Sequence, residues 1–72
     1  MKKYTVGVDV GGTSVKMGVF TVGGDLLFKW EIPTRTEDGG KYVLSDITQS
    51  LEQAREEHNI ALDEIAGIGI GV

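Results

Sequence analysis

A short segment near the start of the chain brings together residue types that bind phosphate: a carboxylate, two adjacent glycines, a hydroxyl and a lysine. These residues are Asp9, Gly11, Gly12, Thr13 and Lys16. Because glycine lacks a Cβ, the backbone at such a turn can approach a ligand closely and adopt positive φ, and successive N–H groups can then bind an anion. Asp9 can hold Mg²⁺ directly or through water, and magnesium commonly accompanies nucleotide phosphates. We interpret this segment as a phosphate-binding hairpin.

Two strands must position these residues. From Tyr4 to Val10 the apolar residues occupy even positions, a period of two that is typical of a strand, so Asp9 is predicted to point away from the apolar face. After residues 11–13 the alternation resumes with Val15 as its first apolar residue. Two strands that flank a glycine turn are predicted to form a β-hairpin.

Two other glycine motifs do not fit this segment. Gly7 and Gly12 have the spacing of a P-loop, but Thr13 stands where that motif needs lysine, and a strand is predicted to follow where the motif needs a helix. The dinucleotide-binding pattern G-x-G-x-x-G at the start of a helix is also missing.

The run DVGGTSVK at residues 9–16 resembles D-x-G-G-T, the first phosphate motif of sugar kinases in the actin, hexokinase and Hsp70 superfamily, and is most similar to the ROK family. The resemblance covers nearly the whole chain. It implies an α/β fold, a partial ribonuclease-H-like (actin-like ATPase) lobe with three antiparallel strands, one helix and one further parallel strand beside the first. It also implies a glucokinase-like transferase that moves the γ-phosphoryl of MgATP to a hexose.

The resemblance also implies a role for each matching residue. Asp9 is expected on the magnesium side, Gly11 and Gly12 supply backbone that approaches the phosphates closely, and Thr13 supplies a hydroxyl. Lys16 is either a cation that faces the phosphates or a solvated strand residue, and the two interpretations have equal weight. The catalytic base, the sugar site and a zinc site with cysteine and histidine ligands are expected outside this chain, which has no cysteine.

A second turn and a third strand are predicted next. Residues 21–25 contain a glycine pair and suit a structural turn. In the strand Leu26–Ile32, Trp30 shares the face of Leu26 and Phe28, so core packing is favoured over a sugar- or base-stacking role. The other face of this strand is more polar, which indicates an edge or half-solvated position.

A polar linker at residues 34–40 is predicted to lead into an amphipathic helix at about residues 41–58. Either Thr34 with Glu37, or Asp38 alone, could cap this helix. Asn59 suits its C-terminal end.

A final strand is predicted at Ile65–Val72, where glycine and isoleucine alternate. Its glycine face is expected to let the helix approach the sheet closely.

Two other polar residues are functional candidates. Arg35 is favoured as a solvated residue over a substrate contact. His58 is favoured as a cation at a helix terminus over a metal ligand.

Composition limits the remaining possibilities. The chain has 72 residues, 40% of them hydrophobic, and a net charge of −4, which disfavours nucleic acid as a partner. No apolar run suits a membrane span or a signal peptide, so a cytoplasmic location is expected. Because the last strand runs to the final residue, residues 1–72 are interpreted as the N-terminal part of the small nucleotide-binding lobe of a longer protein. Such a small core with open strand edges is expected to self-associate.

Two rival classes share this fold. ROK-type transcriptional repressors carry a helix-turn-helix ahead of the phosphate hairpin, and here only three residues precede Tyr4, which favours the enzyme. Another actin-like or Hsp70-like ATPase would keep the same phosphate chemistry without a sugar.

Overall fold

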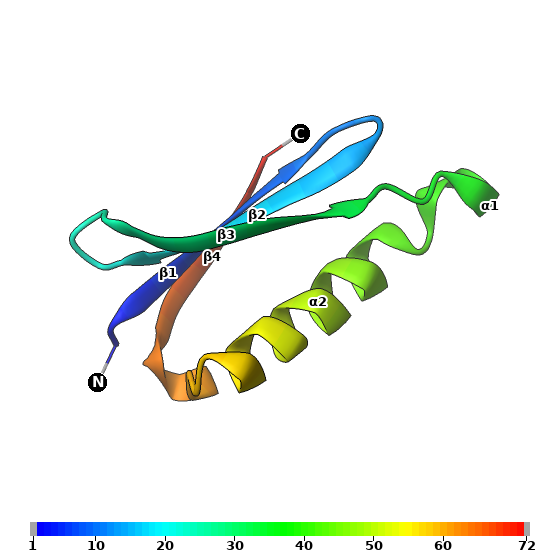
Figure 1. Ribbon diagram of the computed structural model, residues 1–72. Coiled ribbons are helices and arrows are strands. Elements are labelled where there is room, and N and C mark those ends of the chain that lie inside the picture. Colours follow the sequence, from blue (N-terminus) through cyan, green and yellow to red (C-terminus); the bar gives the residue numbers. More distant parts are fainter. Residues whose placement is uncertain (1, 72) are drawn as a thin grey trace.

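The structure is a computed structural model that describes residues 2–71, except for the side chain of Asp38. It consists of a four-stranded mixed sheet with one long helix across one face (Figure 1). The strand order is β3-β2-β1-β4; β1, β2 and β3 are antiparallel, and β4 is parallel to β1. The predicted α/β class, with three antiparallel strands and one parallel strand, is therefore confirmed. The strands are β1 (Tyr4–Val10), β2 (Ser14–Thr21), β3 (Leu26–Pro33) and β4 (Ile65–Gly71).

The parallel strand lies beside the first one, as the family resemblance implied. Val6 is in register with Ile68, and Asp9 is in register with Gly71. Because parallel strands run in the same direction, the carboxyl ends of β1 and β4 lie side by side at the end of the sheet where the β1–β2 turn begins. The edge position predicted for the third strand is also confirmed.

The core lies between the sheet and α2 (Val43–Glu57) (Figure 1). Apolar residues recur at helical spacing along α2, so one face of the helix is apolar and packs against the sheet. Ile47 of this face is buried, and Val43 and Leu51 pack beside it. The buried side chains of the sheet are Val6, Val8, Val15, Met17 and Val19, and Ile60 completes the core after the helix.

None of the helices within residues 2–71 is long and apolar enough to cross a membrane.

Aromatic residues of β3 join this core. Trp30 packs against the buried core, as predicted, and its indole N–H donates a hydrogen bond to the Ser50 hydroxyl at 2.7 Å. The His58 ring stacks on Phe28, with 3.7 Å between the ring centroids. His58 thus extends the aromatic packing at the end of α2.

The ends of the helix differ in part from prediction. A short helix, α1 (Glu37–Gly40), lies inside the expected linker, and α2 begins at residue 43 without a side-chain cap. Capping by Thr34 is wrong, because its hydroxyl donates instead to the carbonyl of Gly11. The alternative cap, the Asp38 side chain, lies outside the described part of the structure. Asn59 has a φ of 55° and follows the helix, as predicted.

A register shift in the β2–β3 pairing moves one predicted core residue to the other face. Val19 pairs with Phe28, but Phe20 pairs with Leu26, which leaves Leu27 as the extra residue of a bulge. A shift of one residue reverses the face on which a side chain lies. Leu26 therefore lies near Gly18, on the face away from α2, and does not share the face of Phe28.

The orientation predicted for β4 is also wrong. Gly69 lines the face of the sheet opposite α2, beside Gly7, and Ile68 lies on the helix side near Leu51. A Cβ added at any glycine of β4 would meet no other atom within 4 Å, so α2 does not approach these glycines. The register with β1 decides the orientation, because residues paired with valines must share the valine face.

Candidate phosphate-binding site

The candidate site is the turn of the β1–β2 hairpin together with the open face of the sheet. Gly11, Gly12 and Thr13 form the turn, and all three are exposed. The N–H of Gly11 donates to the carbonyl of Ser14 at 2.9 Å, which closes the turn. Asp9 is the penultimate residue of β1 and lies exposed on the face opposite α2, as its odd position predicted.

The two turn glycines serve different purposes. A Cβ on Gly11 would lie 3.0 Å from the Ser14 carbonyl oxygen, so this position needs glycine for the turn itself. A Cβ on Gly12 would meet nothing within 4 Å, which leaves space for a ligand to approach the backbone. Neither glycine has φ in the left-handed region, so the expected positive φ is wrong here. Any anion contact must therefore use backbone with ordinary φ.

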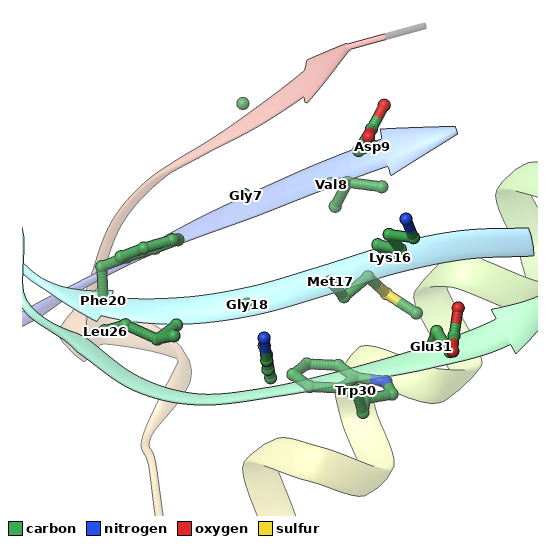
Figure 2. Close-up of a pocket in the computed structure, with 12 residues that line it drawn as sticks. Gly7, Val8, Asp9, Lys16, Met17, Gly18, Phe20, Leu26, Trp30 and Glu31 are labelled. Carbon is green, nitrogen blue, oxygen red and sulfur yellow. The ribbon is translucent and has the colours of Figure 1, made fainter. Parts of the chain in front are cut away.

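Lys16 faces the same open side as Asp9. The two residues are direct partners in the β1–β2 register, and Lys16 is also the direct partner of Glu31 in the β2–β3 register. The three charged side chains thus form a row across three strands, at one end of an open groove of about 740 Å³ (Figure 2). Phe20 lies toward the other end of this groove in the same view.

Sequence reasoning missed Glu31 as a neighbour of this site. The available signal was its position on the polar face of β3, but only the strand register places it opposite Lys16. Glu31 and Asp9 put a carboxylate on each side of the lysine (Figure 2). Opposite charges on adjacent strands attract, but among the described residues no ion pair joins Lys16 to either carboxylate.

Thr34 is a second residue that sequence reasoning assigned elsewhere. Its hydroxyl donates to the carbonyl of Gly11 at 2.9 Å, and its backbone N–H donates to the carbonyl of Thr13 at 3.1 Å. These two bonds tie the hairpin turn to the segment that follows β3. The only sequence signal was its place directly after Pro33, which pairs with Ser14.

The segment after β3 is fixed in turn to the start of α2. The Arg35 guanidinium donates to both carboxylate oxygens of Asp46, at 2.7 and 2.6 Å, and its Cζ lies 4.4 Å from the centre of the Tyr42 ring. The bidentate hydrogen bond lowers the pKa of Asp46 and raises that of Arg35. Arg35, predicted to be a solvated residue, therefore links β3 to α2.

The chain is similar in sequence to bacterial glucokinases. The chain is 41% identical over 69 residues to a glucokinase of Halalkalibacterium halodurans, and 36% identical over 67 residues to a glucokinase of Streptomyces coelicolor. These matches cover 96% and 93% of this chain, but it spans only about a fifth of the length of those relatives. No protein-family model matches the chain.

Solved structures agree with the sequence matches. A candidate sugar kinase from Cytophaga hutchinsonii superposes with a TM-score of 0.66 and 28% identity, over 94% of this chain and 21% of that one. The resemblance to the ROK sugar kinases is confirmed. A candidate N-acetylmannosamine kinase from Listeria monocytogenes, at 22% identity and a TM-score of 0.58, shares the fold over 93% of this chain.

The ROK resemblance implies MgATP, and the residues of the turn fit it. Within residues 2–71 no group of three or more His, Asp or Glu side chains is placed to hold a metal by itself. Mg²⁺ seldom needs such a group, since it keeps several waters and is often bound by one or two carboxylates together with substrate phosphates. Asp9 offers one exposed carboxylate near the end of β1, and the backbone at Gly12, three residues later, is open to a ligand.

Proposed function

We propose that this chain supplies the phosphate-binding hairpin of an ATP-dependent sugar kinase that phosphorylates glucose or a closely similar hexose. The observation that carries the proposal is the hairpin itself: a Cβ on Gly12 would meet no atom within 4 Å, and Asp9, which lies three residues earlier near the end of β1, is exposed. The relatives described as glucokinases support the hexose assignment. They also favour a sugar kinase over an actin-like ATPase.

Each residue of the hairpin has a role in this proposal. Asp9 holds the magnesium ion that accompanies the nucleotide, directly or through water, and the backbone at Gly11 and Gly12 lies against the phosphates. Thr13 contributes a hydroxyl, and Lys16 contributes positive charge from β2. Magnesium, when bound, neutralises charge that develops on the phosphoryl oxygens. Fixed donors and cations aimed at those oxygens stabilise the transition state more than the ground state.

The reaction also needs parts that lie outside the hairpin. A hexose hydroxyl oxygen forms a bond to the γ-phosphorus while the bond from that phosphorus to ADP breaks, and a base accepts the hydroxyl proton. We place this base and the sugar site elsewhere in the full-length protein. The proposal therefore assigns phosphate binding to this chain and assigns no proton transfer to it.

A coupled assay of ADP production tests the proposal. The full-length protein is assayed with MgATP and, in parallel, with glucose, N-acetylmannosamine or no sugar. We expect glucose-dependent ADP production from the full-length protein and none from residues 1–72 alone. ADP production that does not depend on any sugar would instead indicate an actin-like ATPase, and no ADP production under any condition would favour the regulator class.

A further inference from the structure

The glycine turn of the hairpin is not fixed by burial. Residues 11–13 are all exposed, and only the bond from Gly11 N–H to Ser14 closes the turn from within. Exposed glycine backbone has many accessible conformations, so holding it in one shape costs conformational entropy. A phosphate site nevertheless needs its donors at fixed positions. Contacts from outside the turn must provide that order.

Thr34 provides two such contacts, on either side of Gly12. Its hydroxyl holds the carbonyl of Gly11, and its N–H holds the carbonyl of Thr13. In a planar trans peptide the C=O and N–H of one unit point in opposite directions. Fixing the carbonyl of Gly11 toward Thr34 therefore directs the N–H of Gly12 away from it.

The N–H of Gly12 is available for a ligand. Within residues 2–71 it has no hydrogen-bond acceptor, and a Cβ on the same residue would meet no atom within 4 Å. We propose that Thr34 is a positioning residue whose two hydrogen bonds to the β1–β2 turn orient the Gly12 N–H toward a phosphate oxygen of the bound nucleotide. This inference rests on the proposed function, because it takes the hairpin to be a nucleotide-phosphate site.

Thr34 is itself held in place on both sides. Pro33 before it is the last residue of β3 and pairs with Ser14, while Arg35 after it is fixed to Asp46 by two hydrogen bonds. The position of Thr34 is thus set by the sheet and by α2 together. The hydroxyl contact spans 23 residues of sequence, so it fixes the hairpin relative to the rest of the fold.

The test compares three variants of the full-length protein. Thr34→Val removes the hydroxyl and keeps both the branched shape and the backbone N–H. Thr34→Ser keeps the hydroxyl and should restore the wild-type behaviour. Thr36→Val is the matched control, because Thr36 is exposed and makes no side-chain cap in α1. Binding of MgATP is measured by calorimetry without sugar, and KM for MgATP and KM for glucose are measured in the coupled assay.

We expect Thr34→Val to weaken MgATP binding about 5- to 10-fold, the size of one hydrogen bond, and to leave KM for glucose unchanged. Thr34→Ser and Thr36→Val should bind MgATP as the wild-type protein does. Thr34→Ala replaces the valine variant if that one loses its cooperative melting transition. Wild-type affinity in the valine or alanine variant, or an equal loss in the serine variant, would overturn the role of Thr34. Failure of the wild-type protein itself to bind MgATP would instead contradict the proposed function.

Discussion

Asp9 carries the metal role in this account, although it contributes little to the fold. It is exposed on the open face of the sheet, and no ion pair within residues 2–71 uses its carboxylate. We expect Asp9→Asn to lower kcat about 100-fold in the full-length protein, since it removes transition-state stabilisation, and to change the unfolding free energy by less than about 0.5 kcal/mol.

The control for this prediction is Asp25→Asn. Asp25 is also an exposed aspartate, but it lies in the β2–β3 turn, where it bonds to Thr21 through its backbone N–H and carbonyl. Steady-state kinetics and thermal melting of both variants give the comparison. Unchanged kcat together with a lowered melting temperature in Asp9→Asn would make Asp9 a structural turn residue.

Gly11 and Gly12 are adjacent, but we expect replacement of Gly11 to lower stability and replacement of Gly12 to weaken ligand binding. Gly11→Ala places a Cβ 3.0 Å from backbone oxygen, so we expect a loss of about 1–2 kcal/mol of stability. Gly12→Ala meets no atom of the protein within 4 Å, so stability should stay within about 0.5 kcal/mol while MgATP binding weakens. Chemical denaturation and calorimetry separate the two effects. Equal stability losses in both variants would contradict this distinction.

The sequence predicted the candidate-site residues that lie next to one another in the chain. It missed those that reach the site only because β3 pairs with β2. Asp9 and the turn glycines are recognisable because their spacing is local and follows the period of one strand. Glu31 and Thr34 reach the site through the β2–β3 register and the length of β3, which no local pattern specifies. The roles of Asp9, Gly12 and Lys16 in phosphate binding remain predictions.

One ion pair, between Arg35 and Asp46, joins the segment after β3 to the start of α2. Arg35 donates two hydrogen bonds to Asp46 and thereby lowers the pKa of this carboxyl from its ordinary value of 3.8. A carboxyl whose pKa is lower in the folded state stabilises the fold above its unfolded pKa. That stabilisation is lost as the pH falls through the lowered folded pKa.

Asp46→Asn removes this linkage, so the variant should be less stable than the wild-type protein by a constant amount above about pH 5, given the ordinary carboxyl pKa near 4. The difference in melting temperature should shrink as the pH falls below the ordinary pKa of 3.8. Melting curves of both proteins from about pH 7 to about pH 2, which extends well below the ordinary carboxyl pKa, give the measurement. A difference that persists unchanged at the acid end would show that the pair does not titrate in this way.

Some features of the strands and helices were predictable from the sequence, and others were not. Strand and helix positions followed from residue periodicity, because each element has one apolar face. The side of the sheet on which Leu26 lies, and the side on which the β4 glycines lie, did not follow from periodicity. A single bulged residue in β3 places Leu26 on the face opposite the predicted one. Pairing with β1 decides which face the β4 glycines occupy. Register is a property of two strands together, so the sequence of one strand does not determine it.

At the scale of the whole molecule, apolar surface remains open on the helix side of β4. The exposed fractions are 51% for Ile68, 53% for Ile70 and 67% for Leu44 of α2. Strands β3 and β4 form the two edges of the sheet. Exposed apolar side chains next to an unpaired strand edge favour association, so we expect residues 1–72 alone to form dimers or larger species.

Sedimentation velocity across a dilution series measures this association. The double variant Ile68→Lys and Ile70→Lys should shift residues 1–72 toward monomer. Val22→Lys should not, because Val22 is exposed in the distant β2–β3 turn. A well-folded wild-type monomer that persists at high concentration would contradict the prediction.

In the proposed function, the β1–β2 turn contacts the phosphates of a nucleotide. Calorimetric titration of the full-length protein with MgATP and with adenosine tests it most directly, because the two ligands differ in the phosphates and the metal. We expect the wild-type protein to bind MgATP at least about 100-fold more tightly than adenosine, a difference of about 2.7 kcal/mol, and we expect Gly12→Ala to weaken binding of MgATP alone. Equal weakening for both ligands, or no change for either, would contradict it.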